Sequence, residues 1–422
     1  MKSILIKNGR IIDPANNFDK VANIFIADGK IHTIDTDCAA DEIIDAENKI
    51  VAPGLIDMHV HFREPGQESK EDFLSGSKAA LHGGYTTVAT MPNTSPTVDN
   101  SALVRSMIKR AEDVGLINIK IIGALTKNQN GAELAELFDM IEAGAVAFSD
   151  DGHFDDNAKI FMNGLDYLKP TNKIIICHEE ESSLVKDGVM NEGIRSAMLG
   201  MKGRPTIAED IAVARDCLLA EYTGGKVHIA HISSARSVEI VRDAKARGVN
   251  VTAEVTPQHL TMTEDLVNPA DSSTKINPPL RTEKDCAACL AGLIDNTIDF
   301  IVTDHSPHAA EEKDREYIFA PSGFPGLETS LGILLTDLYH KNKITLDKLI
   351  SKMTAEPAKI FNLNAGNLSI GANADITIID TETDWIVDDK KFYTRGSHSP
   401  FIGRNLKGRA VATIAHGILY KF

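Results

Sequence analysis

Short apolar runs alternate with longer amphipathic segments from about residue 54 to residue 364. This alternation is typical of βα units, in which a helix covers each buried parallel strand. We count eight such runs, at 55–60, 86–90, 117–123, 145–148, 173–177, 226–230, 250–254 and 299–303. Eight parallel strands can close into a barrel whose functional residues lie at the carboxyl ends of the strands. The pattern therefore predicts an α/β protein with a (β/α)₈ barrel of the TIM type.

Both ends of the chain have a different pattern, in which short apolar strands are separated by tight turns. Asn8-Gly9 and Asp28-Gly29 stand where hairpins need residues that tolerate a positive φ. Strand-like runs return after residue 374. We therefore expect a small β-sandwich domain built from residues 1–54 and 365–422, with the barrel occupying residues 55–364.

Composition narrows the class of protein. With 43% hydrophobic and 25% charged residues, the chain is an ordinary globular protein. Its net charge of −16 disfavours a nucleic-acid partner, although a few local cations could still bind a small anionic substrate. No run approaches the about 18 apolar residues of a membrane span. Five scattered cysteines fit a reducing compartment, so we expect a cytoplasmic protein without membrane contact.

Residue types that bind metal ions follow five of the eight predicted strands. They are His59 and His61, Asp150 and Asp151, His178, His231, and Asp304 with His305. Side chains two apart in a strand point to the same side, so His59 and His61 can face the barrel axis together. Because these strand ends meet at one mouth of a barrel, the side chains should converge. Imidazole and carboxylate suit Zn²⁺, with Mn²⁺ or Co²⁺ as substitutes, and the number of ligands favours two ions.

Longer motifs surround these residues: PGLIDMHVHFREPG at 53–66, GGYTT at 83–87, MPNT at 91–94, FSDDG at 148–152 and VTDHSPH at 302–308. Together they resemble the dihydroorotase signature of the amidohydrolase superfamily. Because the motifs are long, correctly ordered and spread from residue 53 to residue 308, the resemblance covers essentially the whole chain.

The resemblance implies two zinc ions and assigns their ligands: His59, His61 and Asp304 to one ion, His178 and His231 to the other, and Asp151, with a hydroxide, to both. Hydantoinases, allantoinases and some dihydroorotases are expected to bridge their metals with a carboxylated Lys at the end of the fourth strand. Residues 145–148 contain no Lys, so the resemblance favours the bacterial type I dihydroorotases. Spacing alone leaves open whether Asp150 or Asp151 reaches the metals.

The resemblance also implies a reaction, the reversible cyclisation of N-carbamoyl-L-aspartate to dihydroorotate and water in pyrimidine biosynthesis. Asp304 would accept a proton from the attacking water and deliver it to the departing amide nitrogen, as general base and then general acid. The substrate keeps a free carboxylate, which needs cations or neutral donors. The residues implied to bind substrate are His61, Arg63, Asn93, Asn277, His308, Ser322 and Gly323. The resemblance implies that Arg63, Asn93 and His308 hold the carboxylate, while Asn277 and the backbone of residues 321–323 contact the ring.

Several of these positions also have a structural interpretation. Arg63 could instead form a surface ion pair with Glu64 or Glu68. The parity of His305 points it away from the mouth. Cys177 is expected to be a buried thiol, and His228 and His259 are expected to be hydrogen-bonded structural histidines. Residues 309–315 form a charged stretch, which we expect to be a solvated mobile loop that could gate the site.

Two other functions remain open at this point. An allantoinase or hydantoinase would favour a bridging Lys and have less use for Arg63, Asn93 and His308. A non-catalytic scaffold for a transcarbamoylase should lack several metal ligands, whereas every expected ligand is present. The resemblance also implies a homodimer and leaves association with aspartate transcarbamoylase open.

Overall fold

Eight parallel strands form the barrel in the computed structural model, which describes residues 2–153 and 156–422. Their hydrogen-bonded order is β6-β7-β8-β9-β10-β13-β14-β15, and a parallel bridge between Val60 and His305 nearly closes the ring. The strands are Leu55–Val60 (β6), Tyr85–Thr90 (β7), Asn118–Gly123 (β8), Ala147–Ser149 (β9), Ile175–Cys177 (β10), Val227–Ile229 (β13), Val251–Val255 (β14) and Phe300–Ile301 (β15). Each overlaps one predicted run, so the predicted barrel is confirmed.

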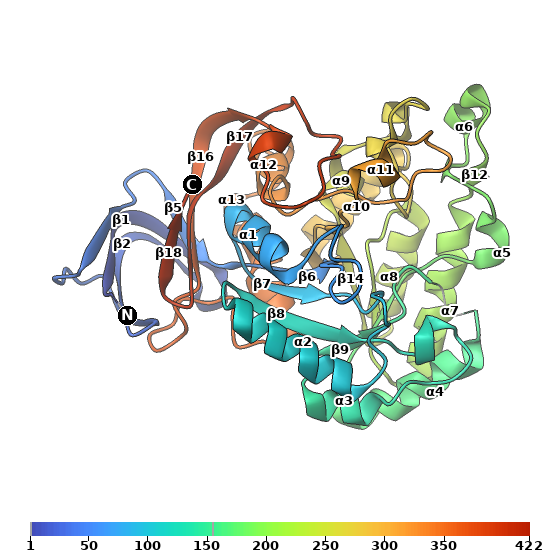
Figure 1. The fold of residues 1–422 in the computed structure, drawn as a ribbon, viewed down its shortest axis with the longest axis horizontal. Coiled ribbons are helices and arrows are strands. Elements are labelled where there is room, and N and C mark those ends of the chain that lie inside the picture. The colour runs from blue at the N-terminus through green and yellow to red at the C-terminus, as the bar shows by residue number, and fades with distance from the viewer. Residues whose placement is uncertain (1, 154–155) are drawn as a thin grey trace.

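Helices surround the barrel strands (Figure 1). They are Phe73–Gly83 (α1), Ser101–Val114 (α2), Leu137–Ala143 (α3), Ala158–Leu168 (α4), Ser182–Val185 (α5), Ile194–Leu199 (α6), Ile207–Thr223 (α7), Ala235–Ala246 (α8), Pro257–Thr261 (α9), Glu283–Asp295 (α10), Ala310–Lys313 (α11), Ser330–Leu334 (α12), Leu346–Met353 (α13) and Ala355–Ile360 (α14). Short turns of 3₁₀ helix lie at Pro14–Asn16, Lys127–Gln129, Lys169–Thr171, Glu264–Leu266, Ser272–Thr274 and Asp389–Lys391. A π-helical turn lies at Leu335–Tyr339. A two-stranded parallel ribbon pairs Met190–Asn191 (β11) with Gly203–Arg204 (β12).

Helix α2 illustrates how the sequence sets these elements. The Asn100 side chain accepts hydrogen bonds from the first free backbone N–H groups of the helix. Val104, Met107 and Ala111 recur at helical spacing and form its buried face. Gly115 ends the helix in the left-handed conformation, at φ 61°. The helix therefore begins, packs and ends where its residue types require.

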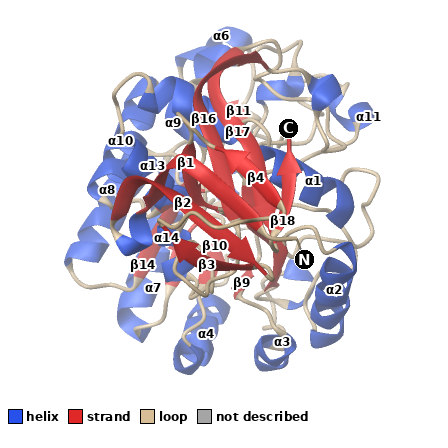
Figure 2. Cartoon of the chain, turned by 90° about the vertical axis from the view of Figure 1, so that its left-hand side faces the viewer, coloured by secondary structure: helices blue, strands red, loops and turns tan. Residues whose placement is uncertain are grey.

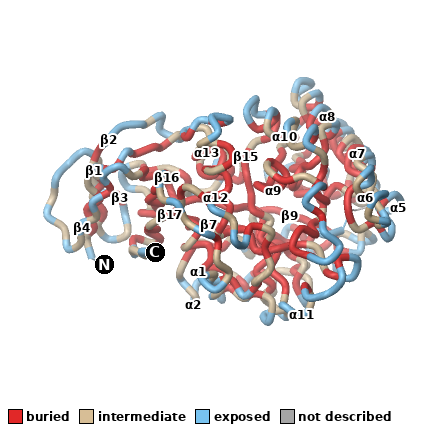
Figure 3. Tube along the Cα trace, turned by 90° about the horizontal axis from the view of Figure 1, so that it is seen from above, coloured by how far each residue is buried: buried red, intermediate tan, exposed pale blue. Residues whose placement is uncertain are grey.

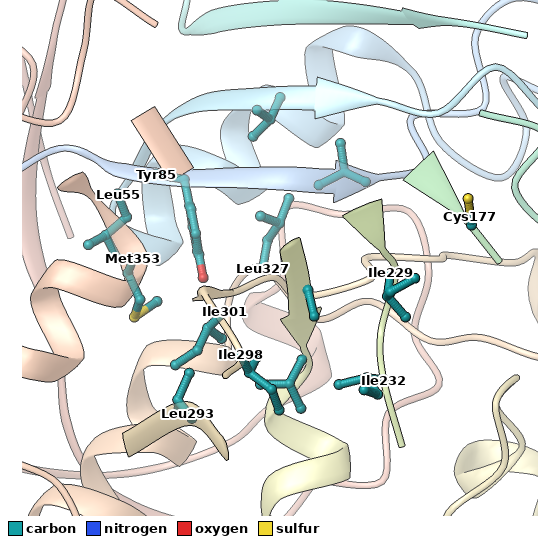
Figure 4. Close-up of a cluster of buried hydrophobic side chains, with 14 of the residues drawn as sticks. Leu55, Tyr85, Cys177, Ile229, Ile232, Leu293, Ile298, Ile301, Leu327 and Met353 are labelled. Carbon is teal, nitrogen blue, oxygen red and sulfur yellow. The ribbon is translucent and has the colours of Figure 1, made fainter. Parts of the chain in front are cut away.

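The largest apolar cluster fills the space between the strands and the helices. Figure 4 shows part of it, including Leu55, Tyr85, Ile301 and Met353, and Figure 3 shows the chain through the barrel as almost continuously buried. A second cluster lies inside the barrel and includes Ile56, Met58 and Phe300 with Phe361, which follows α14. The interior is therefore packed, and a site can form only at one end.

Strands from both chain ends form one mostly antiparallel sheet beside the barrel (Figures 1 and 2). They are Ile4–Asp13 (β1), Phe18–Ala27 (β2), Lys30–Ile34 (β3), Glu42–Asp45 (β4), Ile50–Pro53 (β5), Ile376–Ile386 (β16), Asn405–Ala415 (β17) and Ile418–Lys421 (β18). Strand β5 joins the two halves, because it pairs with β1 on one side and with β16 on the other. The predicted domain built from both termini is therefore present. Its boundaries at 54/55 and 364/365 stay a prediction.

The sheet is attached to the amino-terminal end of the barrel strands. Thr413 Oγ1 donates a hydrogen bond to the carbonyl of Leu81, in the last turn of α1, at 2.8 Å, and Thr377 Oγ1 donates to the carbonyl of Gly84, directly before β7, at 2.5 Å. The sheet itself therefore does not cover the opposite, carboxyl end. None of the helices in the described part of the chain has the length and apolarity needed to cross a bilayer.

Candidate functional site

A register shift in β6 turns two histidines toward the mouth of the barrel. Ile56 and Met58 join the apolar cluster inside the barrel, so strict alternation would direct His59 and His61 outward. The register against β7 shifts between Asp57 and Val60, however, and changes the phase of the strand. As a result the His59 and His61 rings lie close together, with centroids 5.4 Å apart.

Asp151 lies between two pairs of histidines, all buried. Its Oδ1 is 3.4 Å from His59 Nε2 and its Oδ2 is 3.5 Å from His61 Nε2. On the other side, its Oδ1 is 3.7 Å from His178 Nδ1 and 3.6 Å from His231 Nε2. The two groups, His59–His61–Asp151 and Asp151–His178–His231, each have the donor atoms to hold a metal ion and share one carboxylate.

The donor atoms of these clusters fit bound cations. His59 Nε2 and Asp151 Oδ1 are buried and have no hydrogen-bond partner among the described residues. Leaving a buried polar atom unpaired costs about 1–3 kcal/mol. His178 Nδ1 and His231 Nε2 converge to 3.0 Å, as nitrogen atoms that ligate one ion would. Imidazole and carboxylate donors of this number suit Zn²⁺ and similar divalent ions.

Unlike charges stabilise one another within the clusters. Burial would raise the pKa of Asp151, but the imidazoles of His59, His178 and His231 outweigh it and hold this pKa well below its usual range. Burial would lower the pKa of His178, but Asp151 and Glu180 raise it to about 9. The carboxylate is thus ionised, and a bound cation would replace protons on the imidazoles.

A second layer of side chains orients the two histidines of β6. His59 Nδ1 donates to Glu254 Oε1 at 2.6 Å, and His61 Nδ1 donates to Asn93 Oδ1 at 2.9 Å. Each bond leaves the Nε2 atom free to face Asp151. Glu254 also accepts from His228 Nε2 at 3.0 Å, which makes His228 a hydrogen-bonded structural residue, as predicted. Sequence reasoning missed Glu254, although this carboxylate is the last residue of the predicted seventh strand.

Asp304 lies beside the same cluster from the eighth strand. Its Oδ1 is 3.3 Å from His61 Nε2 and accepts a hydrogen bond from Ser306 Oγ at 3.0 Å. Burial would raise the pKa of Asp304, but His61 and His59 lower it to about 2. Its φ of 50° is uncommon outside glycine and is the kind of backbone strain that gathers at functional sites.

The neighbouring acidic and imidazole groups face other parts of the chain. The Asp150 carboxylate accepts from the backbone N–H groups of Leu125 at 2.9 Å and Thr126 at 3.1 Å, away from the histidines. His305 Nε2 lies 3.3 Å from Glu71, and its Nδ1 accepts from Gly326 N at 3.2 Å. Asp151 and Asp304 are therefore the members of each adjacent pair that face the clusters.

All predicted substrate-binding residues line one cleft of about 240 Å³ above the clusters. Its walls are His61, Arg63, Asn93, Asp151, Gly152, His178, His231, Asn277, Asp304, Ser306, His308, Ser322 and Gly323. Residues from strands and loops far apart in sequence therefore meet around one small volume, which suits a small molecule. Gly152 and Ser306 are lining residues that the sequence analysis did not name.

Arg63 is a buried cation in this cleft. Its Nε donates to the Pro307 carbonyl at 3.3 Å, and it forms no ion pair with Glu64 or Glu68 among the described residues. Glu64 pairs instead with Arg110 at 2.7 Å. Burial lowers the pKa of Arg63, which Asp304 and Asp151 oppose. The alternative of a surface ion pair is therefore wrong.

Other predictions near the mouth have mixed outcomes. His259 Nε2 donates to the Pro278 carbonyl at 3.0 Å and Cys177 is buried, so both are structural, as predicted. His308 Nε2 donates to the Ser322 carbonyl at 2.8 Å, at the edge of the cleft. The stretch 309–315 is not simply a solvated loop: it contains α11, whose Lys313 is buried. This lysine escaped the sequence analysis because its neighbours are charged and exposed.

Comparison with known proteins agrees with this geometry. A family model described as "Dihydro-orotase-like" matches residues 48–237. A dihydroorotase from Pelotomaculum thermopropionicum is 50% identical over 98% of this chain and 97% of its own length, and one from Pelobacter propionicus is 46% identical over 99% and 100%. An L-hydantoinase (dihydropyrimidinase) structure from Arthrobacter aurescens superposes with a TM-score of 0.88 at 26% identity, covering 99% of this chain and 96% of that chain.

The fold and the site define the class, a cyclic amide hydrolase built on an amidohydrolase-type barrel with metal-binding clusters at its mouth. Within this class the near full-length identities decide the particular family. The chain belongs to the dihydroorotase family.

Proposed function

We propose that this chain is a dihydroorotase that interconverts N-carbamoyl-L-aspartate and (S)-dihydroorotate in pyrimidine biosynthesis. The observation that carries the proposal is a buried arginine, Arg63, in the same cleft as the Asp151-centred clusters. A cyclic amide that bears a carboxylate needs both features: a centre that activates water and a fixed cation for the anion. Asn93 and His308 lie in the same cleft, and the amide NH₂ group of Asn93 is a neutral donor for the carboxylate.

The proposed metal site would take two zinc ions: His59, His61 and Asp304 would hold one, His178 and His231 would hold the other, and Asp151 would be shared between them. When bound, such ions lower the pKa of water and polarise a carbonyl oxygen. The buried and unpartnered donor atoms of His59 and Asp151 support this assignment.

Asp304 performs the proton transfer in our proposal. In the hydrolytic direction the carboxylate accepts a proton from the attacking water as the new carbon–oxygen bond forms at the ring carbonyl. It then delivers this proton to the ring nitrogen as the carbon–nitrogen bond breaks, which yields the ureido group and a carboxylic acid that loses its remaining proton to solvent. The hydrogen bond from Ser306 holds Asp304 toward the cleft during both steps. The biosynthetic direction reverses these steps.

Two alternatives are less well supported. The hydantoinase alternative rests on the similarity to the L-hydantoinase structure. However, β9 and the residue after it contain no Lys that could bridge metals. A non-catalytic scaffold would be expected to lack ligands, whereas all four histidines have a ring nitrogen that faces Asp151 or Asp304.

The test combines a metal assay with substrate selectivity. The full chain is purified, its zinc content is measured, and hydrolysis of dihydroorotate, hydantoin and allantoin is followed before and after chelation. We expect about two zinc ions per chain and preferential turnover of dihydroorotate that chelation abolishes. Activity that survives complete metal removal, or turnover of hydantoin without dihydroorotate, would contradict the proposal.

We further propose that the enzyme is a cytoplasmic homodimer, and we leave association with aspartate transcarbamoylase as a hypothesis for the same preparation. Light scattering should give a mass near twice the chain mass of 45.8 kDa. A monomer at assay concentration would contradict the dimer. Co-elution with purified aspartate transcarbamoylase tests the second association.

A further inference from the structure

A buried lysine holds the backbone that reaches the cleft from the segment after α11. Lys313 is 2% exposed. Its Nζ donates to the carbonyl of Pro321 at 3.1 Å and to that of Gly323 at 2.9 Å. Both carbonyls flank Ser322, whose own carbonyl accepts the hydrogen bond from His308. One ammonium group therefore fixes the chain on either side of a residue that lines the cleft.

The same segment is tied to the chain that carries Asn277. The backbone N–H of Gly323 donates to the Lys275 carbonyl at 2.8 Å, and Ser272 Oγ donates to the Lys313 carbonyl at 2.7 Å. Two stretches that line the cleft, one with Asn277 and one with Gly323, are thus joined through Lys313 and its neighbours. A change at Lys313 should alter their spacing.

Burial of the Lys313 ammonium group costs free energy, because the charge loses its hydration. Burial, together with the nearby Lys275, lowers the pKa of Lys313 to about 8. A buried charge is tolerated only where hydrogen bonds compensate its lost hydration. An apolar side chain of similar length would avoid that cost but leave the Pro321 and Gly323 carbonyls unsatisfied. The contribution of Lys313 therefore lies in the backbone geometry that its hydrogen bonds impose.

We propose that Lys313 is a positioning residue for the substrate: it holds the Ser322–Gly323 backbone at the distance from Asn277 that the substrate ring requires. This inference rests on the proposed dihydroorotase function. Lys313 does not line the cleft and acts through Ser322 and Gly323. Asp151 and Asp304 are held by other contacts, so the loss of Lys313 weakens substrate binding more than bond cleavage.

A second buried lysine supplies a matched control. Lys352 is 1% exposed, and its Nζ donates to the carbonyls of Ile298 and Asp299, both at 2.8 Å. These carbonyls precede β15, at the end of the barrel opposite the mouth. Burial also lowers the pKa of Lys352 to about 8. The two lysines share burial, partner type and charge, and differ in their distance from the cleft.

The experiment compares Lys313→Met with Lys352→Met in the zinc-loaded full chain, using steady-state hydrolysis of dihydroorotate near neutral pH. For Lys313→Met we expect KM to rise about tenfold or more, with kcat within about threefold of the wild type. For Lys352→Met we expect KM to stay within about twofold, whatever the change in melting temperature. A KM of Lys313→Met within twofold of the wild type would overturn the inference, as would an equal rise in both variants.

A milder variant covers the case in which Lys313→Met does not fold. Ser272→Ala removes only the hydrogen bond to the Lys313 carbonyl, and we expect it to raise KM about threefold with kcat unchanged. A folded Ser272→Ala enzyme with unchanged KM would then overturn the inference. Failure of the wild-type chain to hydrolyse dihydroorotate would contradict the proposed function and, with it, this inference. An active wild type with an unchanged KM in the variants would contradict this inference alone.

Discussion

Adjacent residues of the same type have different tasks at the mouth of the barrel. Asp150 and Asp151 are both buried acids after β9. The carboxylate of Asp150 accepts backbone hydrogen bonds from the loop at Leu125 and Thr126, whereas that of Asp151 faces four imidazoles. The direction of each side chain, rather than its chemistry, separates a structural group from a candidate metal ligand.

Exchange of each carboxylate for an amide tests this difference. We expect Asp151→Asn to lose bound metal and to lower kcat/KM by about 10³-fold or more, because the shared ligand is neutralised. We expect Asp150→Asn to retain metal and to lower the free energy of unfolding by about 1–3 kcal/mol. Elemental analysis and urea unfolding measure both effects. Loss of metal from Asp150→Asn alone would contradict the assignment.

Arg63 offers a second test at the scale of one residue. Its guanidinium is proposed to bind the substrate carboxylate, and hydrogen bonds to charged groups contribute about 1.5–3 kcal/mol. We therefore expect Arg63→Met to raise KM for dihydroorotate about 10- to 100-fold. Arg110→Met is the matched control, because Arg110 pairs with Glu64 outside the cleft. An unchanged KM in Arg63→Met would exclude this role.

At the scale of elements, α14 and the residue after it, Phe361, close the end of the barrel opposite the mouth. Phe361 joins the apolar cluster inside the barrel, and its ring centroid lies 5.8 Å from that of His228 and 6.0 Å from that of Phe300. His228 in turn supports Glu254 beneath the clusters. Packing below the site and geometry within it are therefore linked through these rings.

Truncation of the Phe361 side chain should destabilise the folded protein. We expect Phe361→Ala to lower the free energy of unfolding by about 3–5 kcal/mol, because a buried aromatic side chain leaves a cavity. Phe319→Ala is the control: that side chain is 67% exposed, and we expect a change within about 0.5 kcal/mol. Equilibrium unfolding in urea measures both. Equal effects would show that the end of the barrel opposite the mouth tolerates a void.

The terminal sheet contains a pH-dependent link between its two halves. Lys49 Nζ, just before β5, pairs with Asp380 Oδ2 of β16 at 2.5 Å. Burial would raise the pKa of Asp380, but the bonds from Lys49 and Thr383 lower it to about 2. A carboxyl whose pKa is depressed by folding stabilises the native state above its unfolded pKa of about 4 and loses this effect as pH falls.

We therefore expect the stability difference between the wild type and Asp380→Asn to be largest near pH 6 and to shrink as pH falls from about 4 toward 2. Thermal or urea unfolding across this range measures the difference. A difference that is constant with pH would show that Asp380 contributes through its neutral hydrogen bonds rather than through its charge.

At the scale of the whole molecule, the site draws residues from most of the barrel strands to one mouth. A metal that bridges these strand ends binds only the folded chain and therefore stabilises it. We expect chelation to abolish activity and to lower the melting temperature by several degrees, and zinc to restore both. Differential scanning calorimetry with a parallel assay tests this. An unchanged melting temperature on complete metal removal would contradict the proposed binding.

Apolar periodicity was enough to predict the eight barrel strands and the sheet built from both termini, because burial requires a hydrophobic face in each element. The ligand types at strand ends were also visible in the sequence. Glu254 was missed, although it ends a predicted strand. The burial of Lys313 was not visible, because it depends on the carbonyls of Pro321 and Gly323, which only the folded chain brings to it.

The sequence by itself determined which residues could carry the chemistry and at which end of the barrel they would gather, since strand period and chain order set both. Only the tertiary structure decided which of Asp150 and Asp151 faces the histidines. It also decided the register shift in β6, which turns His59 and His61 toward the mouth of the barrel. The direction of a side chain at a strand end depends on register and loop hydrogen bonds. These form between segments far apart in the chain, and local pattern does not record them.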